Sequence, residues 1–315
     1  MKYILNYKEG SPIAKIRGGI KDKDVIFILD EDDERFKNHD NTNLSDDEKT
    51  NILALNFFRM MKGRMNSKEL NKLQSCLIKE KKPLAKMEKM NEFYENGLDL
   101  LKERTNKEII LKDGKLYPLF NIDKDREVFY IAGMSGSGKS TYISYLMKAY
   151  KLTFPKNRIY LFSEKEEDPA FKDNFFTRVK INEDILKYPF KLEDFRNSFV
   201  VFDDYEDGID KAVSNELKRL SKYVMNKGRS NKINMAYVSH LANDYKNTRD
   251  ILNEMTSCTI FPFTTSQHSL KYLLERYFGF DKEIIKKINN LPSRWVTIYK
   301  VPLLIMYDQG CYLVK

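Results

Sequence analysis

The chain has few cysteines and no long apolar run. Its three cysteines, Cys76, Cys258 and Cys311, lie far apart, and no C-x-x-C pair or Cys/His cluster accompanies them. The sequence therefore predicts neither a disulfide framework nor a zinc site, and we expect reduced, buried cysteines. No apolar run approaches the roughly 20 residues that cross a bilayer, and residues 1–8 lack the apolar core of a signal peptide. These absences predict a protein without a transmembrane segment that stays inside the cell or is packed in a particle.

The composition excludes a disordered chain and suits one large domain or two smaller ones. Hydrophobic residues make up 42% of the 315 residues and aromatic residues 13%, which is enough for a packed core. The net charge of +9 is compatible with a nucleic-acid partner. An AT-rich genome that encodes many lysines would produce the same surplus, so the charge alone gives weak support.

A glycine-rich stretch from Gly133 to Thr141 is the most informative motif. It reads Gly-Met-Ser-Gly-Ser-Gly-Lys-Ser-Thr and fits G-x-x-x-x-G-K-[ST] without a mismatch. An apolar segment at 128–132 predicts a buried strand before it, and apolar residues at helical spacing from Ile143 to Tyr150 predict a helix after it. A chance glycine–serine loop would not have both flanks. The motif therefore predicts a nucleoside triphosphate site.

The motif assigns a role to most of its residues. Backbone N–H groups and the positive end of the following helix would bind the phosphates. Lys139 would contact the β- and γ-phosphates, and the Ser140 hydroxyl would ligate Mg²⁺. We therefore predict ATP and Mg²⁺ as cofactors. The predicted nucleotide-binding residues are Gly133, Ser135, Gly136, Ser137, Gly138, Lys139, Ser140 and Thr141.

Paired carboxylates end a second apolar segment. Asp203 and Asp204 directly follow the run from Phe199 to Phe202, in the manner of a Walker B strand. We assign Asp203 to the Mg²⁺ ion and Asp204 to the attacking water, which it would orient or deprotonate. The alternative is that one carboxylate only caps the turn after the strand. A phosphate loop requires an acidic partner, which favours the paired interpretation.

Two further residues are candidates for sensing the γ-phosphate and neutralising developing charge. His240 follows Ser239 at the end of an apolar segment, 233–240, that would form a strand between the two Walker strands. A solvated or structural histidine is the alternative. Arg229 lies on the loop that enters this strand, where a ring assembly would present it to a neighbour's nucleotide as an arginine finger. The alternative is an ordinary solvated arginine in the basic run 211–232.

Residues 1–125 carry no motif and are predicted to form an α+β accessory region. Short strands are expected at 2–7 and 24–29, and a charged helical stretch runs from about 67 to 104. The residues from Lys112 to Lys115 include an Asp-Gly pair between two apolar segments, which predicts a β-hairpin. The sequence does not indicate what this region does.

Residues 126–315 alternate between strand and helix patterns. They are predicted to form the P-loop ATPase domain, an α/β fold with a central, mainly parallel sheet flanked by helices. The predicted strands lie at 128–132, 158–163, 198–204, 233–240 and 259–263, the later helices at 213–224, 266–278 and 282–290, and a terminal hairpin at 295–314.

Together these features resemble the FtsK/HerA-like packaging ATPases of large DNA viruses, including the poxvirus-type enzyme, and of their virophage relatives. The resemblance covers about residues 126–265. The phosphate loop is common to P-loop NTPases, whereas the Asp203-Asp204 pair and the segment from Gly228 to His240 are more specific. Residues 249–253 are similar to the helix that usually comes next.

The resemblance implies a RecA/FtsK-like fold and a homo-oligomeric ring whose DNA-stimulated ATPase activity drives double-stranded DNA into a preformed capsid. Capsid vertex or portal proteins would be its docking partners, and the host cytoplasm, a viral factory or the virion its location. The chain departs from the family in two places. Glutamine is usual where this chain has His240, and a histidine often follows the Gly-Arg step, where this chain has Ser230.

Two other functional classes stay open from the residues themselves. A P-loop kinase acting on a small molecule or nucleotide usually has an arginine-rich lid, and none is evident. The Asp203-Asp204 pair also suits water activation better than phosphate transfer. A non-catalytic nucleotide-binding scaffold for particle assembly would not need an intact Lys139 together with these carboxylates.

Overall fold

The computed structural model describes residues 3–7, 10–18, 24–30, 50, 53–54, 71, 75, 79, 83–104, 107–165, 168–172, 174–203, 205, 210–240 and 249–314. The chain divides into two compact units, one comprising residues 1–10 and 28–107 and the other residues 11–27 and 108–315. The larger unit thus includes two segments that precede residue 126. The predicted division of the chain into an accessory region, residues 1–125, and an ATPase domain, residues 126–315, stays a prediction.

The smaller unit contains β1 (Tyr3–Asn6), the last residues of β3 (Val25–Asp30) and α4 (Pro83–Arg104). Proline suits the first turn of α4 because an N–H there would have no partner within the helix. Phe93 is buried on this helix, whereas Met87 and Tyr94 on the same helix are exposed.

The larger unit is built around one mixed sheet. Among the described residues this sheet has ten strands, in the order β4-β14-β13-β12-β11-β6-β10-β9-β7-β8. The elements of this unit, besides the first residues of β3, are β2 (Ser11–Arg17), β4 (Glu108–Ile110), β5 (Lys115–Pro118), β6 (Val128–Ala132), α5 (Lys139–Thr153), β7 (Arg158–Ser163), η2 (Pro169–Phe171), β8 (Thr177–Val179), α6 (Asp184–Lys187), η3 (Leu192–Phe195), β9 (Ser198–Asp203), α7 (Lys211–Lys227), β10 (Asn234–Ser239), α8 (Arg249–Glu254), β11 (Ser257–Ile260), α9 (Gln267–Phe278), α10 (Lys282–Asn289), β12 (Val296–Tyr299), β13 (Leu304–Tyr307) and β14 (Gly310–Leu313).

The strands from β11 to β8 run parallel, and β12, β13, β14 and β4 continue the sheet antiparallel. This arrangement confirms the predicted α/β class. It also places β10 between β6 and β9, as the sequence predicted. The carboxyl ends of β6, β9 and β10 therefore meet at one edge of the sheet, which is where ligands bind in open α/β folds.

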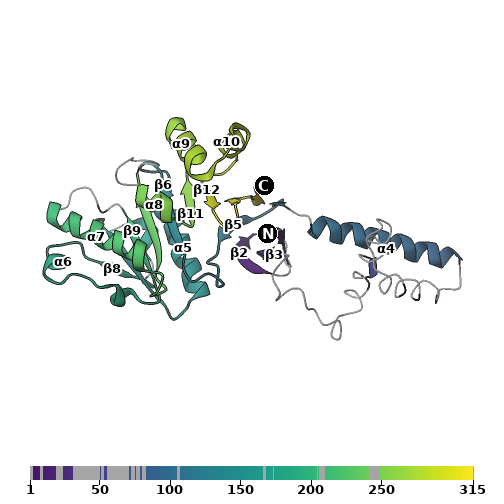
Figure 1. The fold of residues 1–315 in the computed structure, drawn as a ribbon, viewed down its shortest axis with the longest axis horizontal. Coiled ribbons are helices and arrows are strands. Elements are labelled where there is room, and N and C mark those ends of the chain that lie inside the picture. Colours follow the sequence, from purple (N-terminus) through teal and green to yellow (C-terminus); the bar gives the residue numbers. More distant parts are fainter. Residues whose placement is uncertain are drawn as a thin grey trace. The chain divides into compact units, whose positions relative to one another are not determined.

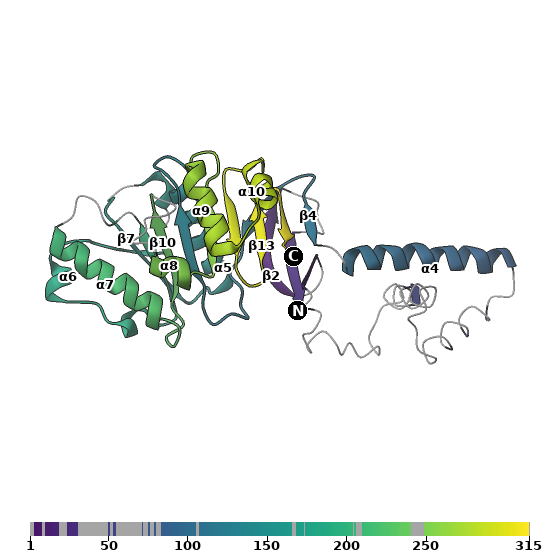
Figure 2. The same ribbon diagram turned by 45° about the horizontal axis from the view of Figure 1, so that its top comes forward.

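Helices cover both faces of the parallel strands (Figure 1). Phe129 and Ile131 of β6 belong to the core cluster that contains the buried face of α5. Val128 and Tyr130 point the other way and join buried residues of α7, α8, α9 and α10. The alternation follows from the two-residue period of a strand, and it explains why a strand buried on both faces is apolar at every position. Figures 1 and 2 both show α7 and α8 side by side.

Of the two predicted hairpins, the one around residues 112–115 does not form and the terminal one does. The turn at Gly114 forms with a φ of +89°, but the strands beside it do not pair: β4 pairs with β14 and β5 pairs with β2. The predicted hairpin there is wrong because each strand finds its partner far away in the sequence. At the end of the chain β13 and β14 do form a hairpin. The segment 295–307 is two strands, β12 and β13, and between them Pro302 has no N–H to donate to a ladder.

The cysteines of the larger unit agree with the sequence prediction. Cys258 and Cys311 are free and fully buried. Burial raises the pKa of both thiols, to about 12 for Cys311, because the charged thiolate is disfavoured away from water. Cys76 lies outside the described residues.

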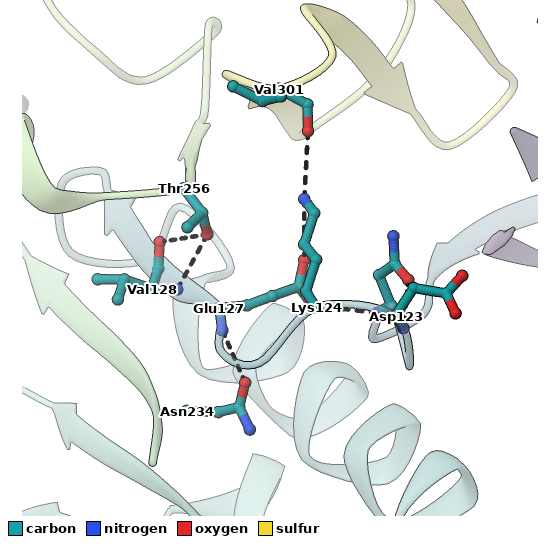
Figure 3. Close-up of polar contacts among 8 residues, drawn as sticks. Asp123, Lys124, Glu127, Val128, Asn234, Thr256 and Val301 are labelled. Atoms are coloured by element: carbon teal, nitrogen blue, oxygen red, sulfur yellow. Dashed lines mark hydrogen bonds and ion pairs between the residues drawn. The ribbon is translucent and has the colours of Figure 1, made fainter. Parts of the chain in front are cut away.

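A buried carboxylate secures the amino end of β6 (Figure 3). Glu127 is 2% exposed, accepts from the N–H of Asn121 at 3.2 Å and lies 3.8 Å from Lys124 Nζ. Its own N–H donates to Asn234 Oδ1 on β10 at 2.8 Å. Lys124 Nζ also donates to the Val301 carbonyl at 3.2 Å, and Figure 3 draws this bond. These bonds connect the start of β6 to its neighbours.

Replacing Glu127 with glutamine is expected to change how stability depends on pH. Burial raises the Glu127 pKa above its ordinary value of 4.5, so the folded chain binds this proton more tightly than the unfolded chain does. The wild type therefore loses stability as pH rises above 4.5 towards the folded-state pKa. A glutamine has no such loss. We therefore measure the free energy of unfolding of both proteins with denaturant from pH 5 to 8. The difference, variant minus wild type, should become more positive as pH rises. The exposed Glu193→Gln variant is the control, and parallel curves for Glu127→Gln and the wild type would contradict the expectation.

Candidate nucleotide-binding site

The phosphate loop starts at Gly133, directly after β6. The Gly133 N–H donates to the Ser239 carbonyl at 3.1 Å, which ties the loop to the end of β10. A Cβ at this position would lie 2.7 Å from Phe261 Cδ2 and 2.7 Å from Ser137 Oγ. Glycine is therefore favoured here, because a Cβ would displace the buried Phe261 ring.

The loop then reverses and enters α5. Ser137 N–H donates to the Met134 carbonyl at 3.2 Å, closing a turn in which Gly136 has a φ of +77°. Gly138, at +108°, is the N-cap of α5 and offers no side chain to the first helical N–H groups. The positive φ values favour glycine at both positions. The N–H groups of the first turn of α5 are thus left for a ligand, as in other anion sites at helix starts.

The structure brings Lys139 and His240 together. Lys139 is 6% exposed, and its ammonium donates to the carbonyls of Gly133 at 2.6 Å and Met134 at 3.2 Å. His240 Nδ1 lies 3.3 Å from the same Nζ. An ammonium has only hydrogens to offer, so Nδ1 accepts this bond and the imidazole proton lies on Nε2. The histidine predicted at the end of the middle strand therefore contacts the lysine predicted in the loop.

Asp203 ends β9 at the same edge of the sheet. It is 1% exposed and accepts from Ser163 Oγ at 3.3 Å. Ser163 is its register partner on β7. A carboxylate this deeply buried is unfavourable without compensating contacts, and carboxylate oxygens are among the hard ligands that Mg²⁺ prefers. Asp204, the predicted water-activating residue, lies outside the described residues.

Arg229 lies at the opposite edge of the sheet. It follows α7 and precedes β10, whereas His240 follows β10, and a six-residue strand spans roughly 20 Å. Its guanidinium is 78% exposed and pairs with Asp125 at 3.3 Å. Arg126 secures the same corner by donating to the carbonyls of Val224 and Met225 at 2.8 and 2.7 Å. Arg229 therefore does not reach the phosphate loop of its own chain.

A cavity of about 620 Å³ lies in front of the phosphate loop. Besides loop residues it is lined by Arg294, Lys165 and Asp168. The sequence did not indicate Arg294, because it lies more than 150 residues from the loop and belongs to no motif; only the folding of β12 beside β11 brings it there. Its exposed guanidinium is a further positive charge at this cavity.

The sheet order and the phosphate loop define a P-loop NTPase fold in which β10 lies between β6, the strand before the loop, and β9, the strand that ends in Asp203. No protein-family model matches the chain. The chain is 34% identical over 241 residues to uncharacterized protein V3 of Sputnik virophage, a match that covers 74% of this chain and 96% of V3. The chain belongs to the same family as this virophage protein, which confirms the virophage relationship that the sequence indicated.

Solved structures with a similar fold include viral proteins. The genome-packaging NTPase B204 of Sulfolobus turreted icosahedral virus 2, in complex with ATP-γS, is 13% identical, with a TM-score of 0.42, and the match covers 59% of this chain and 97% of B204. The pCW3 conjugation coupling protein TcpA with ATPγS is 12% identical, with a TM-score of 0.44, and the match covers 64% of this chain and 65% of TcpA.

Within the described part of the chain, the helices are all too short or too polar to span a membrane.

Proposed function

We propose that the chain is an ATPase motor that translocates double-stranded DNA into a viral capsid. The observation that supports this most directly is the convergence of Lys139, His240 and Asp203 at the carboxyl edge of three neighbouring strands. The family shared with a virophage protein supports the viral setting. B204, one of the proteins with a similar fold, is named a genome-packaging NTPase.

The proposed roles follow from the positions of the side chains. Lys139 would exchange the carbonyls of Gly133 and Met134 for the β- and γ-phosphate oxygens of ATP. Ser140 and Asp203 would supply oxygen ligands for Mg²⁺, which when bound would neutralise charge on the phosphates. His240, in contact with Lys139, would donate its Nε2 proton to the γ-phosphate. Asp204, the next residue after the Walker strand, would orient or deprotonate the attacking water.

The proposed DNA contact is the exposed face of α7 and the loop that follows it. Lys211, Lys222 and Lys227 are exposed there, and Glu216 is the one acidic residue of the helix. Lysines on such a face would contact DNA phosphates without reading sequence, releasing counterions on binding. In this proposal residues 126–315 form the motor and residues 1–125 the accessory region. The motor is a homo-oligomeric ring that docks on capsid vertex or portal proteins, in the host cytoplasm, a viral factory or the virion.

The test is phosphate release with and without double-stranded DNA. We expect stimulation that does not depend on sequence and that falls steeply with salt. Changing Lys211, Lys222 and Lys227 to glutamine should remove most of the stimulation and reduce the salt slope of binding by roughly 0.9 for each DNA phosphate that the variant no longer neutralises. A matched triple variant on α9 and α10, with glutamine at Lys271, Lys282 and Lys286, should keep the stimulation.

The other outcomes identify the alternative functions. Transfer of the γ-phosphate to a small molecule or nucleotide, with no response to DNA, would indicate a kinase. Nucleotide binding without any phosphate release would indicate an assembly scaffold. Either result would overturn the motor proposal.

A further inference from the structure

Beside the phosphate loop lies a second cavity that the loop motif does not account for. Its volume is about 470 Å³, which is within the range of small-molecule sites. It adjoins the cavity in front of the loop, because Gly138, Thr141, Tyr145 and Arg294 line both. A ligand whose phosphates lie on the loop would therefore extend directly into this second cavity.

Aromatic side chains form its walls. Tyr117 packs edge-to-face on Tyr145, with ring centroids 4.9 Å apart and an interplanar angle of 75°. Trp295 packs on Tyr142 at 5.1 Å. Tyr117, Tyr145 and Trp295 are each half-buried, so part of every ring remains accessible. Flat apolar surfaces of this kind stack on nucleobases.

Tyr142 behaves as structural support for this wall. Its hydroxyl is 2.6 Å from Thr297 Oγ1 on β12, and burial raises its pKa to about 12. Tyr142 is 2% exposed and so contributes mainly by fixing Trp295, which presents the accessible ring.

Two buried polar atoms of this cavity lack partners among the described residues. Ser137 Oγ and Asp308 Oδ1 are both buried without a hydrogen bond, and both residues line the cavity. Buried polar atoms in folded proteins nearly always have a partner. Seven such atoms occur among the described residues, and two of them lie at this one cavity, where a bound ligand would supply the missing bonds.

Asp308 determines whether the ligand group beside it is a hydrogen-bond donor or an acceptor. The residue is fixed by its backbone, whose carbonyl accepts from the Leu116 N–H at 2.8 Å and whose N–H donates to Ser293 Oγ at 3.3 Å. Its second carboxylate oxygen lies 3.6 Å from Lys115 Nζ. An ionised carboxylate only accepts hydrogen bonds. The group facing Oδ1 must therefore be a donor.

We propose that this aromatic cavity binds the adenine base of the nucleotide, with Trp295 and Tyr117 stacking on the ring and Asp308 accepting from its exocyclic amine. The inference rests on the proposed ATPase function and adds base selectivity to it. Adenine carries an amine donor at the position where guanine carries a carbonyl acceptor. With this position of the base at Asp308, a carboxylate favours ATP over GTP; equal or tighter binding of GTP, through its N1–H and N2 amine donors, would overturn this orientation of the base.

The first test measures the affinity of the full-length wild-type chain for four probes, each as its Mg²⁺ complex. The probes are ATP, GTP, inorganic tripolyphosphate and purine ribonucleoside triphosphate, an analogue of ATP that lacks the amine. ATP should bind at least about tenfold more tightly than tripolyphosphate because of stacking. It should also bind about tenfold more tightly than the amine-free analogue because of the bond to a charged acceptor. GTP should bind more weakly than ATP.

Substitutions of Asp308 and Trp295 then test which side chain contacts the amine and which stacks on the base. Asp308→Ala should weaken ATP binding about tenfold and leave binding of the amine-free analogue unchanged. Trp295→Leu should weaken the binding of both nucleotides about equally and that of tripolyphosphate not at all. Tyr188→Ala is the matched control, since Tyr188 is 77% exposed and lies outside the cavity.

The results separate this inference from the function on which it rests. Equal affinities for ATP, the amine-free analogue and tripolyphosphate, all dependent on Lys139, would overturn the base site and leave the ATPase proposal intact. A loss of affinity on removing the ribose 2′-hydroxyl, with no effect of the amine, would assign Asp308 to the sugar and overturn the proposed contact. No binding of any of these probes would remove the ATPase proposal itself.

Discussion

Lys139→Ala is expected to abolish tight ATP binding and to reduce phosphate release by about a thousandfold or more. Lys139 is 6% exposed, and its ammonium already donates to two loop carbonyls. It is therefore held by the loop and needs little reorganisation to meet phosphate oxygens. Alanine removes the only lysine charge of the motif, and the N–H groups of the loop would face the phosphates without it.

The measurement is equilibrium binding of Mg²⁺-ATP together with phosphate release under saturating nucleotide. Lys156→Ala serves as the matched control, because Lys156 is an exposed lysine in the turn just after α5. It should bind ATP like the wild type. Wild-type affinity in a folded Lys139→Ala protein would contradict the assignment of the loop as the phosphate site.

Much of the site could be predicted because its parts are local. The strand before the loop, the glycines and the lysine lie within fourteen residues, and their backbone geometry depends on neighbours in the sequence. The strand ending in Asp203 and the strand ending before His240 could be predicted from uninterrupted apolar runs, which are typical of parallel strands buried on both faces. Because these strands run parallel and adjacent, Asp203 and His240 lie at the same edge of the sheet.

The remainder depends on contacts between distant segments. The turn at Gly114 has the local signal of a hairpin, yet β4 pairs with β14 and β5 with β2, about 200 and 100 residues away. The aromatic cavity likewise joins Tyr117, Tyr145 and Trp295, which no periodicity relates. Such juxtapositions are fixed by the order of strands in the sheet, which short-range patterns do not encode.

Arg229 has the right chemistry for hydrolysis but lies at the wrong edge of its own sheet. Its loop precedes β10, while the phosphate loop and His240 lie at the other end of the parallel strands. If Arg229 contributes to hydrolysis, as we propose, it acts on the nucleotide of a neighbouring chain. We therefore expect Arg229→Ala to keep ATP affinity close to that of the wild type and to reduce turnover about a thousandfold, the scale of arginine-finger effects.

The fold itself should tolerate this change. Arg229 and Asp125 are 78% and 62% exposed, and such surface ion pairs contribute about 0–1 kcal/mol to stability. Asp125→Ala breaks the same pair while keeping the arginine. This control should retain turnover if the effect belongs to the guanidinium of Arg229 rather than to the ion pair.

Mixing two inactive variants distinguishes a shared site from a defect within one chain. Lys139→Ala protein has an intact Arg229, and Arg229→Ala protein has an intact phosphate loop. A mixed ring would contain interfaces at which a loop from one variant meets an arginine from the other, so part of the ATPase activity should return. The two variants must first be shown to co-assemble, for example with distinct labels. Co-assembly without recovered activity would exclude Arg229 as a residue supplied across the interface, because complementation is possible only when the two groups act from different chains.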